Sequence, residues 1–478
     1  MTALWTLDAM AAAMGAEKSG SLPAELPGLS IDTRSMNKGE AFFAIKGENR
    51  DGHEFVEAAL KTGAGLAVVA RTQASRFPNA PLLIVDDVLD GLRDLARAAR
   101  ARTQAKVIAV TGSVGKTGTK EALRLALSAE GATHVSAASY NNHWGVPLSV
   151  ARCPRSAKYA VFEIGMNHAG EITPLTRLVR PQVAIVTAIA PVHLEFFGTL
   201  DKIADAKAEI FLGVEKGGAA VLNRDGAQYA RLEKAAKAAG VKRIVSFGEH
   251  AQADARLVRA SLQPDASTVE ASILGQAVTY KLGAPGRHVV LNSLAVLVAC
   301  VLAGADLAIA ALELAKLQPP PGRGARFTLR VPGGSALLID ESYNANPASM
   351  RAAIALLGQA PVGARGRRIA VLGDMLELGN QARALHHGLA EPIEAAGIDL
   401  VYCSGRLMRA LWEALPSSRR GGYAETAADL EPAVLAAIRA GDAVMVKGSL
   451  GSKMGPIVKA LERQFAKPAA LDQAAQDA

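Results

Sequence analysis

The stretch Val110-Thr-Gly-Ser-Val-Gly-Lys-Thr-Gly-Thr-Lys120 decides the fold of this chain. It follows the apolar run at residues 107–110 and precedes the helix-prone segment 121–127, so it predicts a strand, a glycine loop and a helix in succession. Backbone N–H groups of such a loop and the N-terminus of the helix favour negative charge. A lysine and a threonine at the loop end suit outer phosphates and Mg²⁺. The predicted phosphate-binding residues are Gly112, Ser113, Gly115, Lys116 and Thr117.

The nucleotide held by this loop is predicted to be ATP. A guanine-specific switch needs an Asn-Lys-x-Asp motif, and the nearest match, Asn37-Lys-Gly-Glu40, lies upstream and reads as a turn. The usual phosphate-loop pattern has a glycine where this chain has Val110. A glycine-rich turn that binds nothing is therefore the alternative at this point.

The chain is organised as alternating strands and helices. Apolar runs at residues 159–164 and 183–189 alternate with helical stretches such as 202–214, which predicts a mainly parallel sheet covered on both faces. The Pro/Gly-rich break Leu317-Gln-Pro-Pro-Pro-Gly-Arg-Gly324 reads as a linker, after which the alternation restarts. We predict an α/β chain of three domains: a small N-terminal α/β domain (1–103), a central P-loop ATPase-like domain with a parallel sheet (104–317), a C-terminal Rossmann-like α/β domain (318–465), and a flexible tail (466–478).

Composition narrows the class of protein. Net charge is +8, but the basic residues are scattered and aromatic residues make up only 4%, so we expect no nucleic-acid partner. The cysteines Cys153, Cys300 and Cys403 have no metal-ligand spacing, which indicates a reducing, cytoplasmic setting. The first eight residues lack the positive region of a signal peptide, and the longest apolar run, 294–305, is too short to span a bilayer. We expect a cytoplasmic protein with no integral membrane segment.

Polar residues follow two of the central strands. Glu163 lies at the end of the run 159–164, and His193 follows the run 183–189. Ligands of open α/β sheets bind at the carboxyl ends of the strands, so this carboxylate and imidazole are candidates to hold Mg²⁺ beside the phosphates. Taken singly, each would more often be a strand-end polar residue that hydrogen-bonds a loop; together with the phosphate loop, the metal-binding role is favoured.

Nearly the whole chain resembles the Mur ligases of peptidoglycan synthesis, a family in which the short Thr-Gly-x-x-Gly-Lys-Thr loop is normal. The matching stretches are Tyr140-Asn-Asn-His-Trp-Gly-Val-Pro-Leu148, Glu163-Ile-Gly-Met-Asn-His-Ala-Gly-Glu171, His193-Leu-Glu-Phe-Phe-Gly198, Asp340-Glu-Ser-Tyr-Asn-Ala-Asn-Pro347 and Val371-Leu-Gly-Asp-Met-Leu-Glu-Leu-Gly379. The resemblance implies an ATP-dependent amide ligase that works through an acyl phosphate, in cytoplasmic peptidoglycan precursor synthesis.

The resemblance also implies catalytic and metal-binding roles. Lys116 would hold the β- and γ-phosphates, and Thr117, Glu163 and His193 would coordinate magnesium. Lys207 matches the lysine that these ligases commonly carbamylate with CO₂, which turns a cation into an anion able to bind a second Mg²⁺. Without the family, Lys207 would read as a solvated helix lysine. Lys116, Lys207 and His193 are the implied catalytic residues.

Nucleotide and substrate contacts follow from the same resemblance. Asn292 matches the residue that contacts adenine, Asp340 the acid that contacts ribose, and Arg323 the linker arginine that reaches toward the phosphates. The implied substrate-binding residues are Ser30, Asp32, Arg34, Asp51, Asn141, Asn142, Tyr343, Asn344 and Lys447. Leu450 departs from the family, which often has an arginine after the Lys447-Gly-Ser449 sequence.

The segments Tyr343-Asn-Ala-Asn-Pro347 and Leu372-Gly-Asp-Met375 are most similar to the family member that joins D-alanyl-D-alanine to UDP-N-acetylmuramoyl-tripeptide. The Asp-Asn-Pro-Arg motif of the preceding ligase is absent. Whether the third peptide residue is lysine or meso-diaminopimelate stays open, and we expect a monomer. Two alternatives remain: a folylpolyglutamate synthase-like ligase of the same superfamily, and a non-catalytic nucleotide-binding module.

Overall fold

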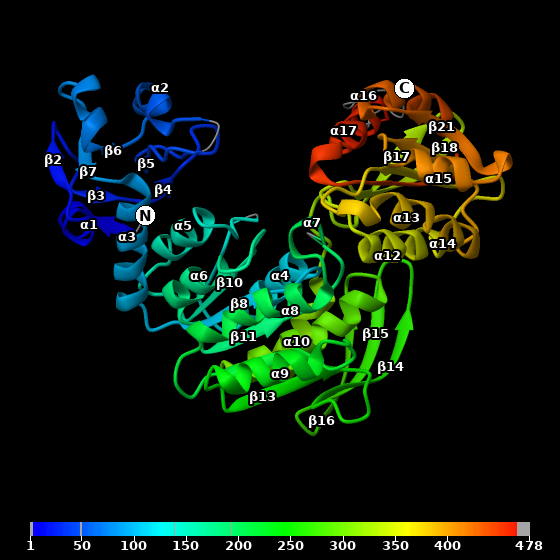
Figure 1. Ribbon diagram of the computed structural model, residues 1–478, viewed down its shortest axis with the longest axis horizontal. Coiled ribbons are helices and arrows are strands. Elements are labelled where there is room, and N and C mark those ends of the chain that lie inside the picture. The colour runs from blue at the N-terminus through cyan, green and yellow to red at the C-terminus, as the bar shows by residue number, and fades with distance from the viewer. Residues whose placement is uncertain (1–2, 48–49, 138, 193, 466–478) are drawn as a thin grey trace, which may run out of the picture.

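The computed structural model describes residues 3–47, 50–137, 139–192 and 194–465, and builds them into three α/β parts. In Figure 1 the N-terminal and C-terminal parts stand on opposite sides of the central part, so the three parts form an open U. The predicted fold class, three domains of mixed α/β structure, is confirmed. The predicted flexible tail, 466–478, lies outside the described residues.

The N-terminal part has a five-stranded sheet in the order β2-β7-β6-β5-β4, parallel except for β2. Helix α3 carries the chain from this part to the central one (Figure 1), and the carboxylate of Asp87 caps its first turn. The elements are β1 (Trp5–Thr6), α1 (Leu7–Met14), β2 (Glu17–Ser19), β3 (Glu25–Leu26), β4 (Leu29–Ser30), β5 (Ala41–Phe43), α2 (Val56–Lys61), β6 (Leu66–Ala70), β7 (Leu82–Val85) and α3 (Val88–Arg102).

The central part has a nine-stranded sheet in the order β16-β15-β14-β13-β12-β11-β8-β10-β9. Its strands run parallel from β9 to β14, while β14, β15 and β16 form an antiparallel extension. The elements are β8 (Lys106–Thr111), α4 (Lys116–Ser128), β9 (Thr133–Val135), α5 (Gly145–Ala151), β10 (Tyr159–Glu163), α6 (Ile172–Val179), β11 (Val183–Val186), α7 (Leu194–Phe197), α8 (Leu200–Ala208), β12 (Ala219–Asn223), α9 (Tyr229–Ala238), β13 (Arg243–Gly248), β14 (Ala255–Leu262), β15 (Ser267–Ile273), β16 (Gln276–Leu282), α10 (Arg287–Leu302) and α11 (Leu307–Glu313).

The predicted helix 202–214 is shorter than expected. Helix α8 ends at Ala208, and a 3₁₀ helix, Glu209–Gly213, follows it. The Glu209 carboxylate accepts hydrogen bonds from the backbone of Gly170 (2.6 Å) and Thr173 (3.0 Å), so a contact distant in sequence holds the point where the helix changes.

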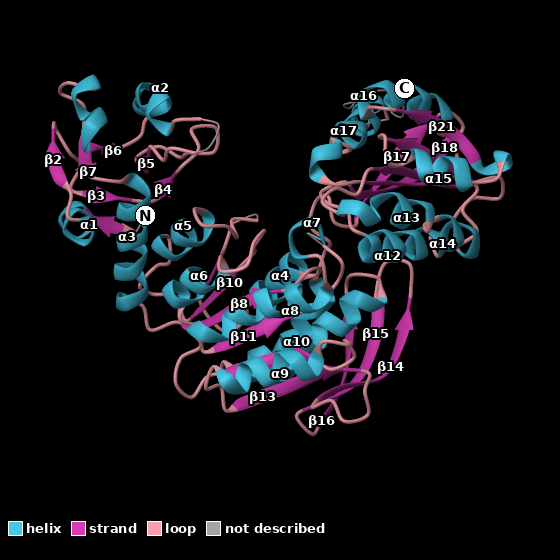
Figure 2. Cartoon of the chain, in the orientation of Figure 1, coloured by secondary structure: helices cyan, strands magenta, loops and turns pink. Residues whose placement is uncertain are grey.

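The C-terminal part has a six-stranded sheet in the order β17-β18-β22-β19-β20-β21, parallel except for the β17–β18 pair, with helices on both sides (Figure 2). Its elements are β17 (Ala325–Val331), β18 (Gly334–Glu341), α12 (Pro347–Gly358), β19 (Arg368–Gly373), α13 (Ala382–His387), α14 (Ala390–Ala395), β20 (Leu400–Ser404), α15 (Arg409–Ala414), β21 (Arg420–Ala424), α16 (Ala427–Ala437), β22 (Ala443–Lys447) and α17 (Gly455–Gln464). Among the described helices of the whole chain, none is both long and apolar enough to cross a bilayer.

Polar contacts join the central part to both of its neighbours. On the N-terminal side, the Trp5 indole N–H donates to the carbonyl of Ala151 at 3.0 Å, and the Arg152 Nε donates to the carbonyl of Leu29 at 2.8 Å. On the C-terminal side, the Glu195 N–H donates to the carbonyl of Glu377 at 3.3 Å. The sites described below lie along these two junctions.

Candidate active site

The phosphate loop is shaped by two glycines in the left-handed region. Gly112 has φ 146° and Gly115 has φ 87°. A Cβ on Gly112 would lie 1.9 Å from the Thr187 Oγ1, and one on Gly115 would lie 2.4 Å from the Asn292 Nδ2. The Thr187 hydroxyl donates to the carbonyl of Val114 at 2.6 Å and so fixes the loop from the neighbouring strand end. Side chains at either glycine would close the concavity that the loop forms.

Lys116 folds back over this loop. Its Nζ donates to the carbonyl of Gly112 at 2.8 Å and lies 3.5 Å from that of Ser113. Burial lowers the pKa of Lys116; the Glu163 carboxylate opposes this effect, and the Arg323 guanidinium adds to it. The charges of Glu163 and Arg323 therefore both act on Lys116, as expected if these three residues surround one phosphate-binding site.

Glu163 lies at the centre of a buried polar network and is only 1% exposed. Its Oε2 accepts a hydrogen bond from the Thr117 hydroxyl at 2.9 Å, and its Oε1 accepts one from the Asn141 Nδ2 at 2.7 Å. Glu163, at the strand end predicted to bind a ligand, thus connects Thr117 of the phosphate loop to Asn141.

The Thr117 and Glu163 oxygens suit a magnesium ion. Both are hard oxygen ligands, and their 2.9 Å separation is close to the ~3.0 Å edge of an octahedron with metal–oxygen distances of about 2.1 Å. His193, the third predicted ligand, lies outside the described residues. In the part of the chain that the structure describes, no group of three or more His, Cys, Asp or Glu side chains is placed to hold a metal.

Lys207 lies inside the protein on α8, with only 1% of the residue exposed. Burial, together with the nearby charge of Lys116, lowers the pKa of Lys207 well below its ordinary value. The reading of Lys207 as a solvated helix lysine is therefore wrong. Its carbamylation stays a prediction.

The N-terminal end of α10 brings Asn292 to the phosphate loop and faces the C-terminal part. The Asn292 amide lies against Gly115, although the two residues are distant in sequence. One turn earlier, desolvation lowers the pKa of His288, and the charges of Glu341 and Lys447 in the C-terminal part also act on its ring. The predicted adenine contact thus lies where the central and C-terminal parts meet.

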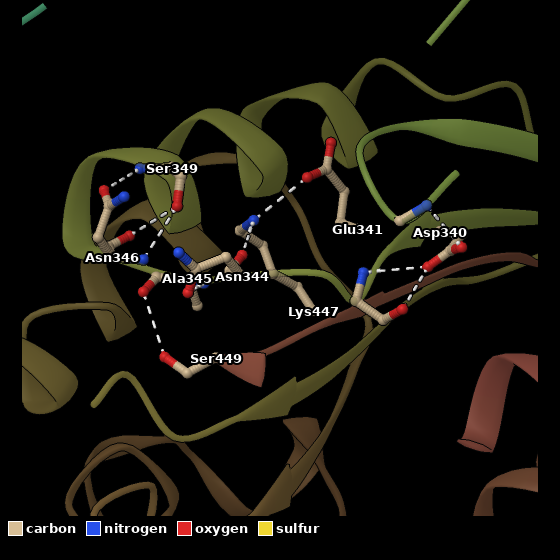
Figure 3. A network of polar contacts seen from close by, with 10 residues as sticks. Asp340, Glu341, Asn344, Ala345, Asn346, Ser349, Lys447 and Ser449 are labelled. Atoms are coloured by element: carbon tan, nitrogen blue, oxygen red, sulfur yellow. Dashed lines mark hydrogen bonds and ion pairs between the residues drawn. The ribbon is translucent and has the colours of Figure 1, made fainter. Parts of the chain in front are cut away.

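The C-terminal part contributes a second polar network at the ends of β18 and β22 (Figure 3). The Asp340 carboxylate accepts hydrogen bonds from the Gly322 N–H at 2.9 Å, the Ser342 N–H at 3.0 Å and the Ser342 hydroxyl at 2.6 Å. Asp340 thereby ties the linker to the sheet, and at 7% exposure it points inward. A contact of this acid with ribose stays a prediction and would compete with these bonds.

Lys447 and Arg323 are also held in this network. The Lys447 Nζ donates to Glu341 at 3.2 Å and to the carbonyl of Asn344 at 3.0 Å (Figure 3), and Lys447 is only 2% exposed. The Arg323 guanidinium stacks on the Tyr343 ring, 4.3 Å from its centroid. The structure therefore brings four predicted residues together: Arg323, Tyr343, Asn344 and Lys447.

A cavity of about 1310 Å³ opens between the N-terminal and central parts. Four predicted substrate-binding residues line it: Asp32, Arg34, Asn141 and Asn142. The Arg34 guanidinium donates to Asp32 at 2.9 Å and 2.6 Å, and these hydrogen bonds lower the pKa of the Asp32 carboxyl. An exposed guanidinium at the wall of a large cavity suits an anionic group such as a phosphate.

Two predicted substrate-binding residues lie away from the lining. Ser30 is 1% exposed, and its hydroxyl donates to the carbonyl of Asp32 at 3.1 Å. Asp51 caps a short 3₁₀ helix and lies 2.6 Å from the His53 Nδ1. In the present structure both residues support the loops that carry lining residues.

Sequence reasoning missed some residues of these sites. Trp144 lines the cavity and packs against Gly47, where a Cβ would lie 3.0 Å from its ring. Glu341 pairs with Lys447 across neighbouring strands. Both residues could have been predicted from the sequence. Trp144 lies in the stretch 140–148 that resembles the Mur ligases, and Glu341 directly follows Asp340 at a strand end.

Family models match three stretches of the chain: the Mur ligase family catalytic domain at residues 25–100, the Mur ligase middle domain at 110–300, and the Mur ligase glutamate ligase domain at 325–450. The chain belongs to the Mur ligase family, which confirms the resemblance seen in the sequence.

Individual relatives match over almost the full length. The UDP-N-acetylmuramoyl-tripeptide–D-alanyl-D-alanine ligase of Escherichia coli is 35% identical over 91% of this chain and 94% of its own. A crystal structure of MurF from Acinetobacter baumannii superposes with a TM-score of 0.82 at 29% identity, covering 96% of this chain and 99% of the other. The MurF ligase of Thermotoga maritima in complex with ADP gives 0.74 at 26% identity, covering 92% and 98%.

Proposed function

We propose that this protein is an ATP-dependent ligase that joins D-alanyl-D-alanine to UDP-N-acetylmuramoyl-tripeptide in peptidoglycan precursor synthesis. One observation carries the proposal: Glu163 is hydrogen-bonded both to Thr117 of the phosphate loop and to Asn141 of the large cavity. A substrate bound in that cavity can extend its peptide carboxylate toward the γ-phosphate of ATP at the loop. Curated relatives that carry out this reaction, such as the one from Escherichia coli, support the choice of substrates.

The chemistry proceeds in two displacements. The C-terminal carboxylate of the tripeptide attacks the γ-phosphorus, the bond to the ADP oxygen breaks, and an acyl phosphate forms. The amine of D-alanyl-D-alanine then attacks the acyl carbon, phosphate leaves, and the nitrogen loses a proton. Lys116 neutralises charge on the transferring group, and the phosphate loop orients it.

Magnesium supplies further charge neutralisation when it is bound with the nucleotide. Thr117 and Glu163 would hold it, together with His193. We also propose that Lys207 is carbamylated, since its lowered pKa favours the neutral amine that adds to CO₂ with loss of a proton. The resulting carbamate would supply a second anionic ligand.

The central experiment measures ATP-dependent phosphate release with UDP-N-acetylmuramoyl-tripeptide, with and without D-alanyl-D-alanine. We expect phosphate release to require both substrates. The product should be heavier than UDP-N-acetylmuramoyl-tripeptide by one D-alanyl-D-alanine joined through an amide bond. Release with a different amino acid in place of the dipeptide would keep the family chemistry but reject this acceptor. No release with any acceptor would favour a non-catalytic nucleotide-binding module.

A prediction for the cavity concerns Arg34. Replacing Arg34 with alanine removes a charged donor from the wall, so the KM for the UDP-linked substrate is expected to rise about tenfold with little change in kcat. Steady-state kinetics with varied UDP-tripeptide measure this change. The matched control is Arg76→Ala, an exposed arginine of the same part that does not line the cavity. Equal KM values for Arg34→Ala and the parental protein would remove Arg34 from the binding site.

A further inference from the structure

Lys120 is a fully buried charged residue that the proposed reaction does not use. It lies on α4, three residues after Thr117 and four after Lys116, so it is on the same side of the helix one turn further along. Its exposed fraction is 0%. A buried charged pair can often be replaced as a whole by apolar residues of similar volume without loss of stability, so a buried lysine is weak evidence of a purely stabilising role.

The ammonium group of Lys120 holds the segment that follows β9. Its Nζ donates to the carbonyl of Ser136 at 2.8 Å and lies 3.2 Å from the Glu121 carboxylate. Ser136 is itself fully buried and is the first residue after the strand. Lys120 thus joins the helix that begins at the phosphate loop to the edge of the central sheet.

Ser136, which Lys120 holds, is in turn hydrogen-bonded to the strand that carries Glu163. The Ser136 N–H donates to the carbonyl of Val161 at 3.1 Å, and its hydroxyl accepts from the Glu163 N–H at 3.3 Å. Ser136 therefore contacts β10 on both sides of residue 162. It fixes the backbone of the residue whose carboxylate meets Thr117.

Asn141 contacts Glu163 and the nearby Gly165. The Asn141 Nδ2 donates to the Glu163 Oε1 at 2.7 Å, and its carbonyl accepts from the Gly165 N–H at 2.8 Å. Lys120 and Thr117 lie one turn apart on α4. Lys120 contacts Ser136, Ser136 contacts the backbone of Glu163, and the Glu163 carboxylate contacts Thr117, so these hydrogen bonds lead back to the same helix. Asn141, which lines the cavity, is connected to these residues through its hydrogen bond to Glu163.

We propose that Lys120 is a positioning residue: through Ser136 it orients the Glu163 carboxylate toward the phosphate loop and holds Asn141 at the cavity wall. The proposal rests on the proposed function in one respect, namely that Glu163 faces a magnesium-bound nucleotide. Loss of such a supporting contact behind a metal ligand typically weakens metal binding or activity by about 10- to 100-fold.

The test compares Lys120→Met, Lys120→Arg and Lys158→Met with the parental enzyme. Lys158 is a matched control, because its Nζ also donates to a backbone carbonyl, that of Glu130 at 3.0 Å, but from an exposed position. In Lys120→Met we expect the Mg²⁺ concentration for half-maximal phosphate release to rise about tenfold or more. Lys120→Arg should recover part of the shift, and Lys158→Met should match the parental enzyme.

A second measurement, hydrogen exchange, needs no ligand. It therefore tests the role of Lys120 even if the proposed function is wrong. Hydrogen exchange of the backbone amides at residues 139–146 is expected to be faster in Lys120→Met than in the parental protein or Lys158→Met. Parental exchange and parental Mg²⁺ dependence in Lys120→Met would overturn the proposal. If Lys120→Met does not fold, Ser136→Ala, which removes the hydroxyl that Glu163 contacts, must raise the Mg²⁺ requirement in the same direction. A parental Mg²⁺ requirement in Ser136→Ala would equally overturn it.

Discussion

Lys116→Ala is expected to lower the rate of amide formation by about a thousandfold, because it removes the cation that we propose meets the transferring phosphoryl group. The variant should remain folded, since the hydrogen bonds of the Lys116 Nζ to described residues go to carbonyls of its own loop, Gly112 and Ser113. Turnover with saturating ATP, tripeptide substrate and dipeptide measures the effect, and a melting curve checks the fold.

Lys106→Ala is the matched control for this prediction. Lys106 is an exposed lysine at the opposite end of β8, so the substitution makes the same change of charge on the strand that leads into the loop. We expect the control to retain parental turnover. A Lys116→Ala enzyme as active as Lys106→Ala would contradict the role given to the loop lysine.

Lys207→Met is expected to lower turnover at least about a hundredfold, because the variant loses the carbamate proposed as a magnesium ligand. The substitution suits the buried site, where an apolar chain of similar length replaces an amine whose pKa is strongly lowered. A ¹³C-bicarbonate NMR spectrum should contain a carbamate signal for the parental protein and none for Lys207→Met.

The control here is Lys202→Met, an exposed lysine on the same helix α8. It should keep both the carbamate signal and the parental rate. A carbamate signal that persists in Lys207→Met would move the modification elsewhere, and parental turnover in that variant would remove Lys207 from the site.

Local patterns predicted the phosphate loop well. The strand, glycine loop and helix from residue 106 to 128 depend on neighbours in sequence, and the structure places β8, the loop and α4 there. Lys116 and Thr117 follow from this local arrangement. The division into domains at the Pro/Gly-rich break stays a prediction; in the structure, Gly322 of that break donates a hydrogen bond to Asp340.

Other features depended on contacts that no local pattern contains. Asn292 reaches Gly115 only because α10 packs beside the phosphate loop, and it was found through the family resemblance. The helix break after Ala208 is set by Glu209 contacts with residues 170 and 173. The antiparallel strands β14 to β16 were missed because their exposed residues interrupt the apolar runs that marked the parallel strands. The 1310 Å³ cavity required two parts of the chain to meet.

The shared hydrogen bonds of Glu163 have a thermodynamic consequence. Glu163 is hydrogen-bonded to both Thr117 and Asn141, so a nucleotide that binds at Thr117 is expected to alter the hydrogen bond between Glu163 and Asn141. If this raises the affinity of the cavity for its ligand by some factor, linkage requires the cavity ligand to raise nucleotide affinity by the same factor. Nucleotide affinity measured with and without the UDP-linked substrate, in the parental protein and in Asn141→Ala, gives the part of any coupling free energy that passes through the Asn141–Glu163 hydrogen bond.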